Sequence, residues 1–146
     1  VSKIGMAGLR LGYVCGRPEW IEAFNRTRSP FNINVLTEAV AIKLLQNKHV
    51  LDAQAAMVLE ERERVRAALA GLPGLKIYPS AANFLLARIA GAKGAGTRVF
   101  GRMKEQGVLV KDLSGGHPLL ENCLRLTVGT PEENRILVAA MREALK

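Results

Sequence analysis

The sequence predicts an α/β fold in which a long helix precedes a small α+β domain. Short apolar runs typical of strands alternate with helical patterns after residue 70. This order is typical of a small mixed or antiparallel sheet covered on one face by helices. Hydrophobic residues make up 49% of the 146 residues, which is enough to form a core. We therefore expect residues 1–50 to be the remnant of a larger domain and residues 51–146 to form a small C-terminal domain led by the long helix.

The first 50 residues are expected to contain one strand and two helices. Apolar residues over Leu9–Val14 predict a buried strand. Pro18 suits the first turn of a helix over residues 19–28, and a second helix is expected over residues 35–45. Because a single strand cannot satisfy its own backbone hydrogen-bonding groups, this part should belong to a larger sheet.

A longer helix is expected to begin near His49 and to end at Leu69, before Gly71 and Pro73. Its apolar residues alternate with acidic and basic residues at helical spacing, so its charged face is expected to be solvated. Four strands are then expected, over residues 76–78, 83–89, 108–111 and 124–128.

Two further helices are predicted by their N-terminal residues. Thr97 is expected to cap a helix that runs through Gln106. Thr130 is expected to cap the final helix, with Pro131 in its first turn and Glu133 completing a capping box. These signals place a helix before the third strand and another after the fourth.

The chain carries a formal net charge of +8, which favours anionic partners. The basic residues form no run longer than a pair, which argues against nucleic acid as the partner. No run approaches the roughly 20 apolar residues of a membrane-spanning helix, so no membrane association is expected. Cys15 and Cys123 are far apart and lack metal-ligand spacing, which favours free thiols in the cytoplasm and no metal site.

Three basic residues are candidates for chemistry: Lys3, Arg10 and Arg125. Lys3 follows Ser2 in a glycine-rich loop, with Arg10 seven residues on. An amine with hydroxyl and guanidinium donors is what a phosphate-bearing aldehyde cofactor needs. The alternative for Lys3 is that it is simply an exposed amine near a chain end. The alternative for Arg125, which lies in the middle of a predicted strand, is that it is a solvated residue at the sheet edge.

Several motifs together resemble the histidinol-phosphate aminotransferase family, a group of fold-type I pyridoxal-phosphate (PLP) aminotransferases. They are Ser2-Lys3, Gly8-Leu9-Arg10-Leu11-Gly12-Tyr13, Asn83-Phe84 and the stretch Asn122-Cys123-Leu124-Arg125-Leu126-Thr127-Val128-Gly129-Thr130. The resemblance follows the chain in order from end to end, and matches the C-terminal half of the family. Because the chain begins with Val1 beside a functional motif, we expect it to be a piece of a longer protein.

The resemblance implies a role for each matching residue. Lys3 would form the covalent aldimine with PLP and later shuttle a proton, while Ser2 and Arg10 would hold the cofactor phosphate. Arg125 would bind the carboxylate of the amino-acid substrate and of glutamate. Lys111, where relatives often have arginine, would bind the substrate phosphate. Asn83 lies in a motif position, with a substrate role and a structural role equally open, and Asn34 has the same ambiguity.

The resemblance also implies a reaction: transfer of the amino group of glutamate to imidazole acetol phosphate in histidine biosynthesis, by a homodimer. The missing part would supply much of the cofactor site, so we expect the chain alone to be inactive. Three alternatives stay open: another class I/II aminotransferase, such as one for aromatic amino acids; a non-catalytic domain that binds phosphate or nucleic acid; and a purely structural domain.

Overall fold

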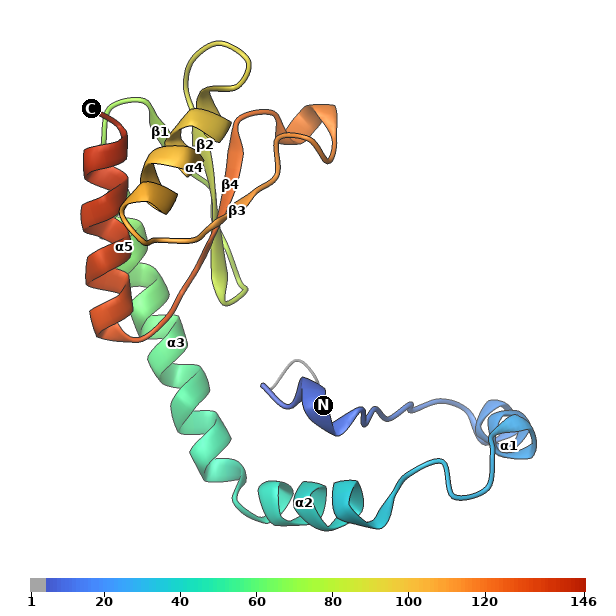
Figure 1. Cartoon of the computed structure of the whole chain (residues 1–146). Coiled ribbons are helices and arrows are strands. Elements are labelled where there is room, and N and C mark those ends of the chain that lie inside the picture. The colour runs from blue at the N-terminus through green and yellow to red at the C-terminus, as the bar shows by residue number, and fades with distance from the viewer. Residues whose placement is uncertain (1–4) are drawn as a thin grey trace. The chain divides into compact units, whose positions relative to one another are not determined.

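The computed structural model describes residues 5–146, and it divides into two compact units after Ala53. Figure 1 shows the elements in chain order. The sequence-based expectation placed the boundary after residue 50.

The N-terminal unit consists of short helical elements. A 3₁₀ turn, η2 (Ala7–Leu9), is followed by the helices α1 (Pro18–Thr27) and α2 (Val35–Gln46). Proline in the first turn of α1 and an asparagine cap on α2 explain where these helices begin. Both helices were expected from the sequence, and their bounds differ from the expected ones by one residue at most.

The strand expected over Leu9–Val14 is not formed. Residues 10–17 belong to no strand or helix, and the side chains of Tyr13 and Val14 are exposed. A strand needs a neighbour to satisfy its backbone groups. No other strand occurs among residues 5–53, so the apolar run has no partner there.

The C-terminal unit contains a four-stranded sheet with the order β1-β2-β4-β3. Every neighbouring pair is antiparallel, so of the two sheet types expected the antiparallel one is formed. The strands are β1 (Leu75–Ile77), β2 (Phe84–Ile89), β3 (Lys111–Asp112) and β4 (Cys123–Thr127).

Three helices cover one face of this sheet, as the sequence predicted: α3 (Lys48–Leu69), α4 (Ala95–Glu105) and α5 (Pro131–Ala144) (Figure 1). Alternate residues of β2 point into the core, which explains its strict alternation of buried and half-buried positions. The core residues are Val65, Leu69, Leu85, Ala87, Ile89, Ala95, Val99, Met103, Leu124, Leu126, Leu137, Ala140, Met141 and Ala144. Burying each large aliphatic side chain contributes about 1.5–3 kcal/mol, so this cluster stabilises the unit.

Helix α3 has 22 residues, and its last turns belong to this core through Val65 and Leu69. Its charged residues form ion pairs along its exposed surface, as with Arg64 and Glu60. Within residues 5–146, no helix combines the length and the apolar character that crossing a membrane requires.

Two predicted boundaries in this unit were wrong. Thr97 does not cap α4, because the helix already begins at Ala95 after Gly94, whose φ of +86° suits glycine. The third strand is only two residues long, and of the expected residues 108–111 it includes only Lys111. This strand lies at the sheet edge and pairs on one side only, so its length equals the number of residues that pair with β4.

The predicted capping box of α5 is confirmed. The Thr130 hydroxyl accepts a hydrogen bond from the Glu133 N–H, and the Glu133 carboxylate accepts one from the Thr130 N–H. These hydrogen bonds lower the pKa of the Glu133 carboxyl below its ordinary value of 4.5, the one from the Thr130 N–H contributing most. The local sequence therefore defines where β4 ends and α5 begins.

Candidate active site

The N-terminal motif is described from Gly5 onward, so Ser2 and Lys3 lie outside the described residues. Gly5 has a φ of +85°, a conformation that favours glycine, and η2 begins two residues later at Ala7. The described chain therefore begins with a compact turn, close in sequence to Ser2 and Lys3.

Arg10 ends this turn in the left-handed conformation, with φ +49° and ψ +32°. Its guanidinium Nη1 donates to the Ala7 carbonyl at 3.2 Å, and the side chain is exposed. Among residues 5–146 no carboxylate pairs with it. A guanidinium with one internal hydrogen bond and several remaining donors fits a phosphate group, so this observation suits the cofactor role implied by the sequence.

Two residues of α2 hold the end of this motif. The buried Thr37 hydroxyl donates to the Leu9 carbonyl at 3.4 Å, and Asn34 Nδ2 donates to the same hydroxyl at 3.0 Å. Asn34 Oδ1 also accepts from the Thr37 N–H at 2.9 Å, which makes it the N-cap of α2. The structure thus gives Asn34 a structural role and connects it to the turn that ends at Arg10.

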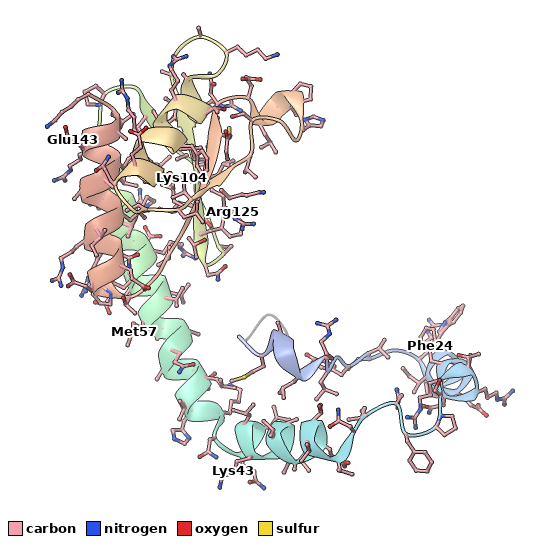
Figure 2. The ribbon with its side chains drawn as sticks, in the orientation of Figure 1. Phe24, Lys43, Met57, Lys104, Arg125 and Glu143 are labelled. Carbon is pink, nitrogen blue, oxygen red and sulfur yellow. The ribbon has the colours of Figure 1, made fainter. Side chains whose placement is uncertain are left out.

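In the C-terminal unit, the face of the sheet opposite the helices carries Arg125 and Lys111. The two residues are cross-strand partners in the β3–β4 pairing, and both are exposed. Directly opposed residues of an antiparallel pair project from the same face, about 5 Å apart at their Cβ atoms. Two of the residues assigned to substrate binding therefore lie side by side (Arg125 is labelled in Figure 2).

Arg125 lies over an aromatic ring. Its Cζ lies 5.6 Å from the centroid of Phe84, which is paired with Thr127 on the same face. This is a cation–π contact, and no carboxylate competes for the N–H groups of the exposed Arg125 guanidinium among the described residues. In the described part of the chain, no carboxylate forms an ion pair with Arg125 or Lys111. Both charges are therefore free for an anionic ligand.

Asn83 lies immediately before β2, next to the end of β4. Its carbonyl accepts a hydrogen bond from the Val128 N–H at 2.9 Å. The side chain is exposed and makes no hydrogen bond to another described residue. The backbone of Asn83 thus closes the β2–β4 pairing, and its side chain remains free for a ligand.

The same sheet face carries cations that were not singled out from the sequence. Lys76 Nζ and Arg88 Cζ lie 5.0 and 5.6 Å from the centroid of the Tyr78 ring. Arg88 Nε also donates to Cys123 Sγ at 3.3 Å, a hydrogen bond that raises the pKa of the Arg88 guanidinium. The alternation of β2 could have placed Arg88 on this face from the sequence. Arg88 is two residues from Leu86 and four from Phe84, and residues two apart in a strand project from the same face.

Each of the four strands thus contributes one cation to this face: Lys76, Arg88, Arg125 and Lys111. Asp112 is the only acidic residue in the four strands, and it is paired with the buried Leu124, on the helix side. An unbalanced row of cations with aromatic rings beside it can bind carboxylates or phosphates.

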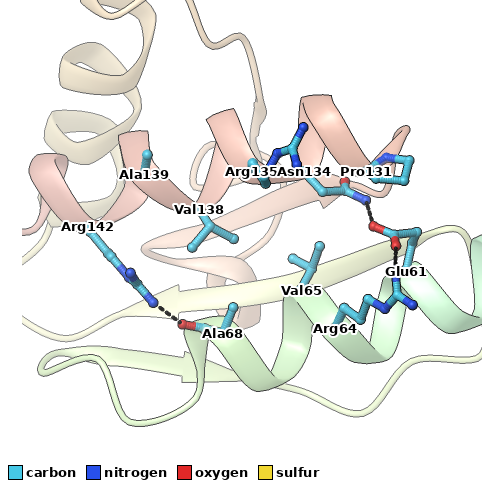
Figure 3. A pocket seen from close by; sticks show the side chains of 10 residues that line it. All are labelled: Glu61, Arg64, Val65, Ala68, Pro131, Asn134, Arg135, Val138, Ala139 and Arg142. Carbon is cyan, nitrogen blue, oxygen red and sulfur yellow. Dashed lines mark hydrogen bonds and ion pairs between the residues drawn. The ribbon is translucent and has the colours of Figure 1, made fainter.

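A groove of about 380 Å³ lies elsewhere in this unit, between α3 and α5 (Figure 3). Asn134 Nδ2 donates to the buried Glu61 carboxylate at 2.9 Å, and Arg142 donates to the Ala68 carbonyl at 3.3 Å. These bonds connect the two helices. None of the residues assigned from the sequence lines this groove, so the open sheet face is the better candidate for substrate binding.

Comparison with known proteins agrees with the resemblance read from the motifs. Residues 2–141 match the model of the class I and II aminotransferases. Histidinol-phosphate aminotransferase 1 of Ralstonia nicotianae is 51% identical over 146 residues, and histidinol-phosphate aminotransferase 2 of Cupriavidus pinatubonensis is 49% identical. Both matches cover 100% of this chain, but only 38% and 39% of those relatives. The chain therefore spans about two fifths of the length of the curated relatives it matches.

Solved structures share the fold. A putative aminotransferase from Burkholderia pseudomallei has a TM-score of 0.86 at 35% identity, covering 99% of this chain and 42% of its own. The histidinol-phosphate aminotransferase of Sinorhizobium meliloti, solved with pyridoxal-5'-phosphate, has a TM-score of 0.81 at 27% identity, covering 97% and 38%. The fold and the family match agree over nearly the whole chain, and the chain belongs to the class I and II aminotransferase family.

Proposed function

We propose that this chain is the C-terminal portion of a PLP-dependent aminotransferase that transfers the amino group of glutamate to imidazole acetol phosphate, forming histidinol phosphate and 2-oxoglutarate. The observation that supports it best is the pairing of Lys111 with Arg125 on a sheet face whose strands carry no acidic side chain there. Two adjacent cations suit substrates with a phosphate or a carboxylate. The choice of histidinol phosphate, a phosphorylated amino alcohol, as the substrate rests on the names of the relatives.

The N-terminal unit is proposed to hold the cofactor. Lys3 would bind it covalently, and the Ser2 hydroxyl and the Arg10 guanidinium would donate hydrogen bonds to its phosphate. The exposed donors of Arg10 support this assignment. When bound, pyridoxal phosphate supplies an electron sink for the electrons of the substrate Cα–H bond. Lys3 Nζ would act as the base that takes the proton from the substrate Cα.

Arg125 is proposed to bind the substrate anion that lies next to the reacting carbon. Histidinol phosphate has a phosphate monoester and no carboxylate, so the carboxylate in question is that of glutamate. A guanidinium can present two parallel N–H donors, which is the geometry a carboxylate accepts best, and the Arg125 guanidinium is exposed and in cation–π contact with Phe84. Lys111 would add a second positive charge for the phosphate, and the free side chain of Asn83 is proposed to hydrogen-bond the substrate.

Further parts of the proposal concern assembly and location. The N-terminal unit exposes large apolar side chains such as Phe31, Val35 and Leu36, which supports contact with further protein, including the second subunit of a homodimer. Cys15 and Cys123 are both free, which supports a reducing, cytoplasmic setting.

The test is to replace the matched 146-residue segment of the Ralstonia nicotianae relative with this chain. We call the product the complemented enzyme. It should transfer amino groups between histidinol phosphate and 2-oxoglutarate, and borohydride reduction should leave a pyridoxyl group on Lys3. The chain alone should show no turnover, since it spans about two fifths of such an enzyme.

Two variants of the complemented enzyme sharpen the test. Arg125→Ala should reduce turnover with both substrates, because both use the same anion site. Arg135→Ala is the control, since Arg135 lies on an exposed turn of α5 and, among the described residues, forms an ion pair only with the nearby Glu132. A complemented enzyme that prefers phenylalanine to histidinol phosphate would instead support the aromatic amino-acid alternative.

A further inference from the structure

The register that places Lys111 beside Arg125 depends on a very short strand. Strand β3 has two residues and pairs with β4 on one side only. The residue before it is outside the strand, and the chain continues from Asp112 into a loop. Its register rests on two residue pairs, Lys111 with Arg125 and Asp112 with Leu124, and on one further hydrogen bond from the Leu113 N–H to the Cys123 carbonyl. Because short edge strands slip or fray easily, something else must hold this one in place.

The Asp112 side chain supplies that attachment. Its partner Leu124 is buried, so Asp112 projects toward the helices while Lys111 projects from the open face. Asp112 Oδ2 accepts a hydrogen bond from the Thr97 hydroxyl of α4 at 2.7 Å. Asp112 Oδ1 accepts from the Ser114 N–H at 2.9 Å and from its hydroxyl at 2.6 Å. One carboxylate therefore connects the edge strand to α4 and to the loop that follows.

The carboxylate is ionised in this setting. Partial burial acts to raise the pKa of the Asp112 carboxyl, but the hydrogen bonds from Ser114 and Thr97 and the charge of Lys111 together lower it below its ordinary value of 3.8. An ionised acceptor forms stronger hydrogen bonds than a neutral one, by roughly twofold. The attachment of β3 is thus strong at neutral pH.

We propose that Asp112 is a positioning residue that keeps Lys111 in register with Arg125, and thereby determines how well the sheet face accepts a phosphorylated substrate. This inference rests on the proposed function. A carboxylate can be bound by the Arg125 fork alone, whereas a phosphate dianion benefits from the second cation at a fixed spacing. Loss of Asp112 should therefore weaken recognition of the phosphorylated substrate more than recognition of glutamate.

The first measurement uses the 146-residue chain itself and does not depend on enzymatic activity. The Leu113 N–H donates to the Cys123 carbonyl at 2.9 Å and reports on the β3–β4 pairing, while the Ile89 N–H, bonded to the Asn122 carbonyl, reports on the end of β2 next to β4. In Asp112→Ala, Leu113 should exchange its amide hydrogen at least about tenfold faster, with Ile89 unchanged. Unchanged exchange at Leu113 would overturn the inference.

The second measurement compares the two half-reactions of the complemented enzyme. Asp112→Ala should raise KM for histidinol phosphate by about tenfold or more, and KM for glutamate by less than about twofold. Thr97→Val removes one hydrogen bond at similar side-chain volume and should give a smaller selective effect. It also keeps the test valid if Asp112→Ala folds poorly. An equal change for both substrates would mean a purely structural role.

Lys111→Ala separates this inference from the function on which it rests. If Lys111→Ala is selective for the phosphorylated substrate and Asp112→Ala is not, the positioning role is wrong and the proposed function stands. If Lys111→Ala is not selective, the assignment of Lys111 itself fails. Glu133→Ala, which removes the capping box of α5, is the control for a general loss of stability and should affect both half-reactions alike.

Discussion

The two units of this chain differ in how much of their apolar surface is buried. In the C-terminal unit, fourteen residues from three helices and two strands form one buried cluster. In the described part of the N-terminal unit, only Thr37 and Ala41 are buried. Yet α2 has an apolar sequence, and its Val35 and Leu36 are each 76% exposed. Both units form helices at the predicted places, but only one of them has a core.

The comparison teaches that local signals suffice to define helices, whereas a core needs a second apolar surface to pack against, which the sheet supplies in the C-terminal unit. A helix that is apolar on all sides is normally buried. The helices of the N-terminal unit depend on capping and on hydrogen bonds within the helix, as with Asn34 and Thr37. We therefore expect this unit to contribute little to the cooperative stability of the isolated chain.

Hydrogen exchange should show the largest difference. Amides of the C-terminal core, such as those of Leu126 and Met103, should exchange only through cooperative unfolding, because both residues are fully buried. Amides of α2 should exchange through local opening. We expect protection factors to differ by about a thousandfold or more, measured by NMR on the 146-residue chain. Similar protection in both units would contradict the comparison.

Matched leucine truncations should give the next largest effect. Leu126→Ala removes a side chain with no solvent exposure and should lower the free energy of unfolding by about 2–5 kcal/mol. Leu36→Ala removes an exposed side chain and should change it by less than about 0.5 kcal/mol. Urea unfolding followed by far-UV circular dichroism measures both. Equal losses would show that α2 is part of the same cooperative core.

The link between α3 and α5 should matter less than the core. Asn134→Ala leaves the buried Glu61 carboxylate with Arg64 as its remaining partner, at a cost of about 1–3 kcal/mol. Asn47→Ala is the matched control in the N-terminal unit, where the Asn47 amide donates to the exposed Lys43 carbonyl. It should leave the unfolding transition unchanged. A larger loss of unfolding free energy in Asn47→Ala than in Asn134→Ala would contradict the view that the C-terminal unit is the more stable one.

Loss of a helix cap should have a smaller effect, and again in one unit only. Thr130→Ala removes the cap of α5 and should lower the free energy of unfolding by about 1 kcal/mol. Asn34→Ala removes the cap of α2 and should reduce the local helix signal without moving the unfolding midpoint. Thermal unfolding, read by circular dichroism and by NMR of each unit, distinguishes the two results.

The pH dependence should be the smallest effect. The pKa of Glu133 is lowered in the folded state, so its contribution to stability is present above its ordinary value of 4.5 and is lost as the pH falls through the folded value. Glu133→Gln keeps a capping side chain but does not titrate, so stability should fall less steeply between pH 6 and pH 3. An unchanged slope would mean that the capping carboxylate does not contribute to this titration.

The sequence could predict much of this fold because its signals are local. The capping box of Thr130 and Glu133 involves four consecutive residues, and the alternation of β2 identifies its buried side from six. The motifs around Arg10 and Arg125 also identified the family. The strand expected over Leu9–Val14 failed because an apolar run predicts a strand only where a neighbouring strand is available to pair with it.

The sequence by itself identified the family, the candidate residues for the chemistry and where most helices begin. Only the tertiary structure decided that Lys111 is the neighbour of Arg125 and that one cation from each strand lies on the same face. It also decided that Thr97, which the sequence predicted as a helix cap, hydrogen-bonds to Asp112 instead. The reason is physical: the side of a strand on which a residue projects follows from its own alternation, but the register between strands depends on hydrogen bonds and core packing between distant segments.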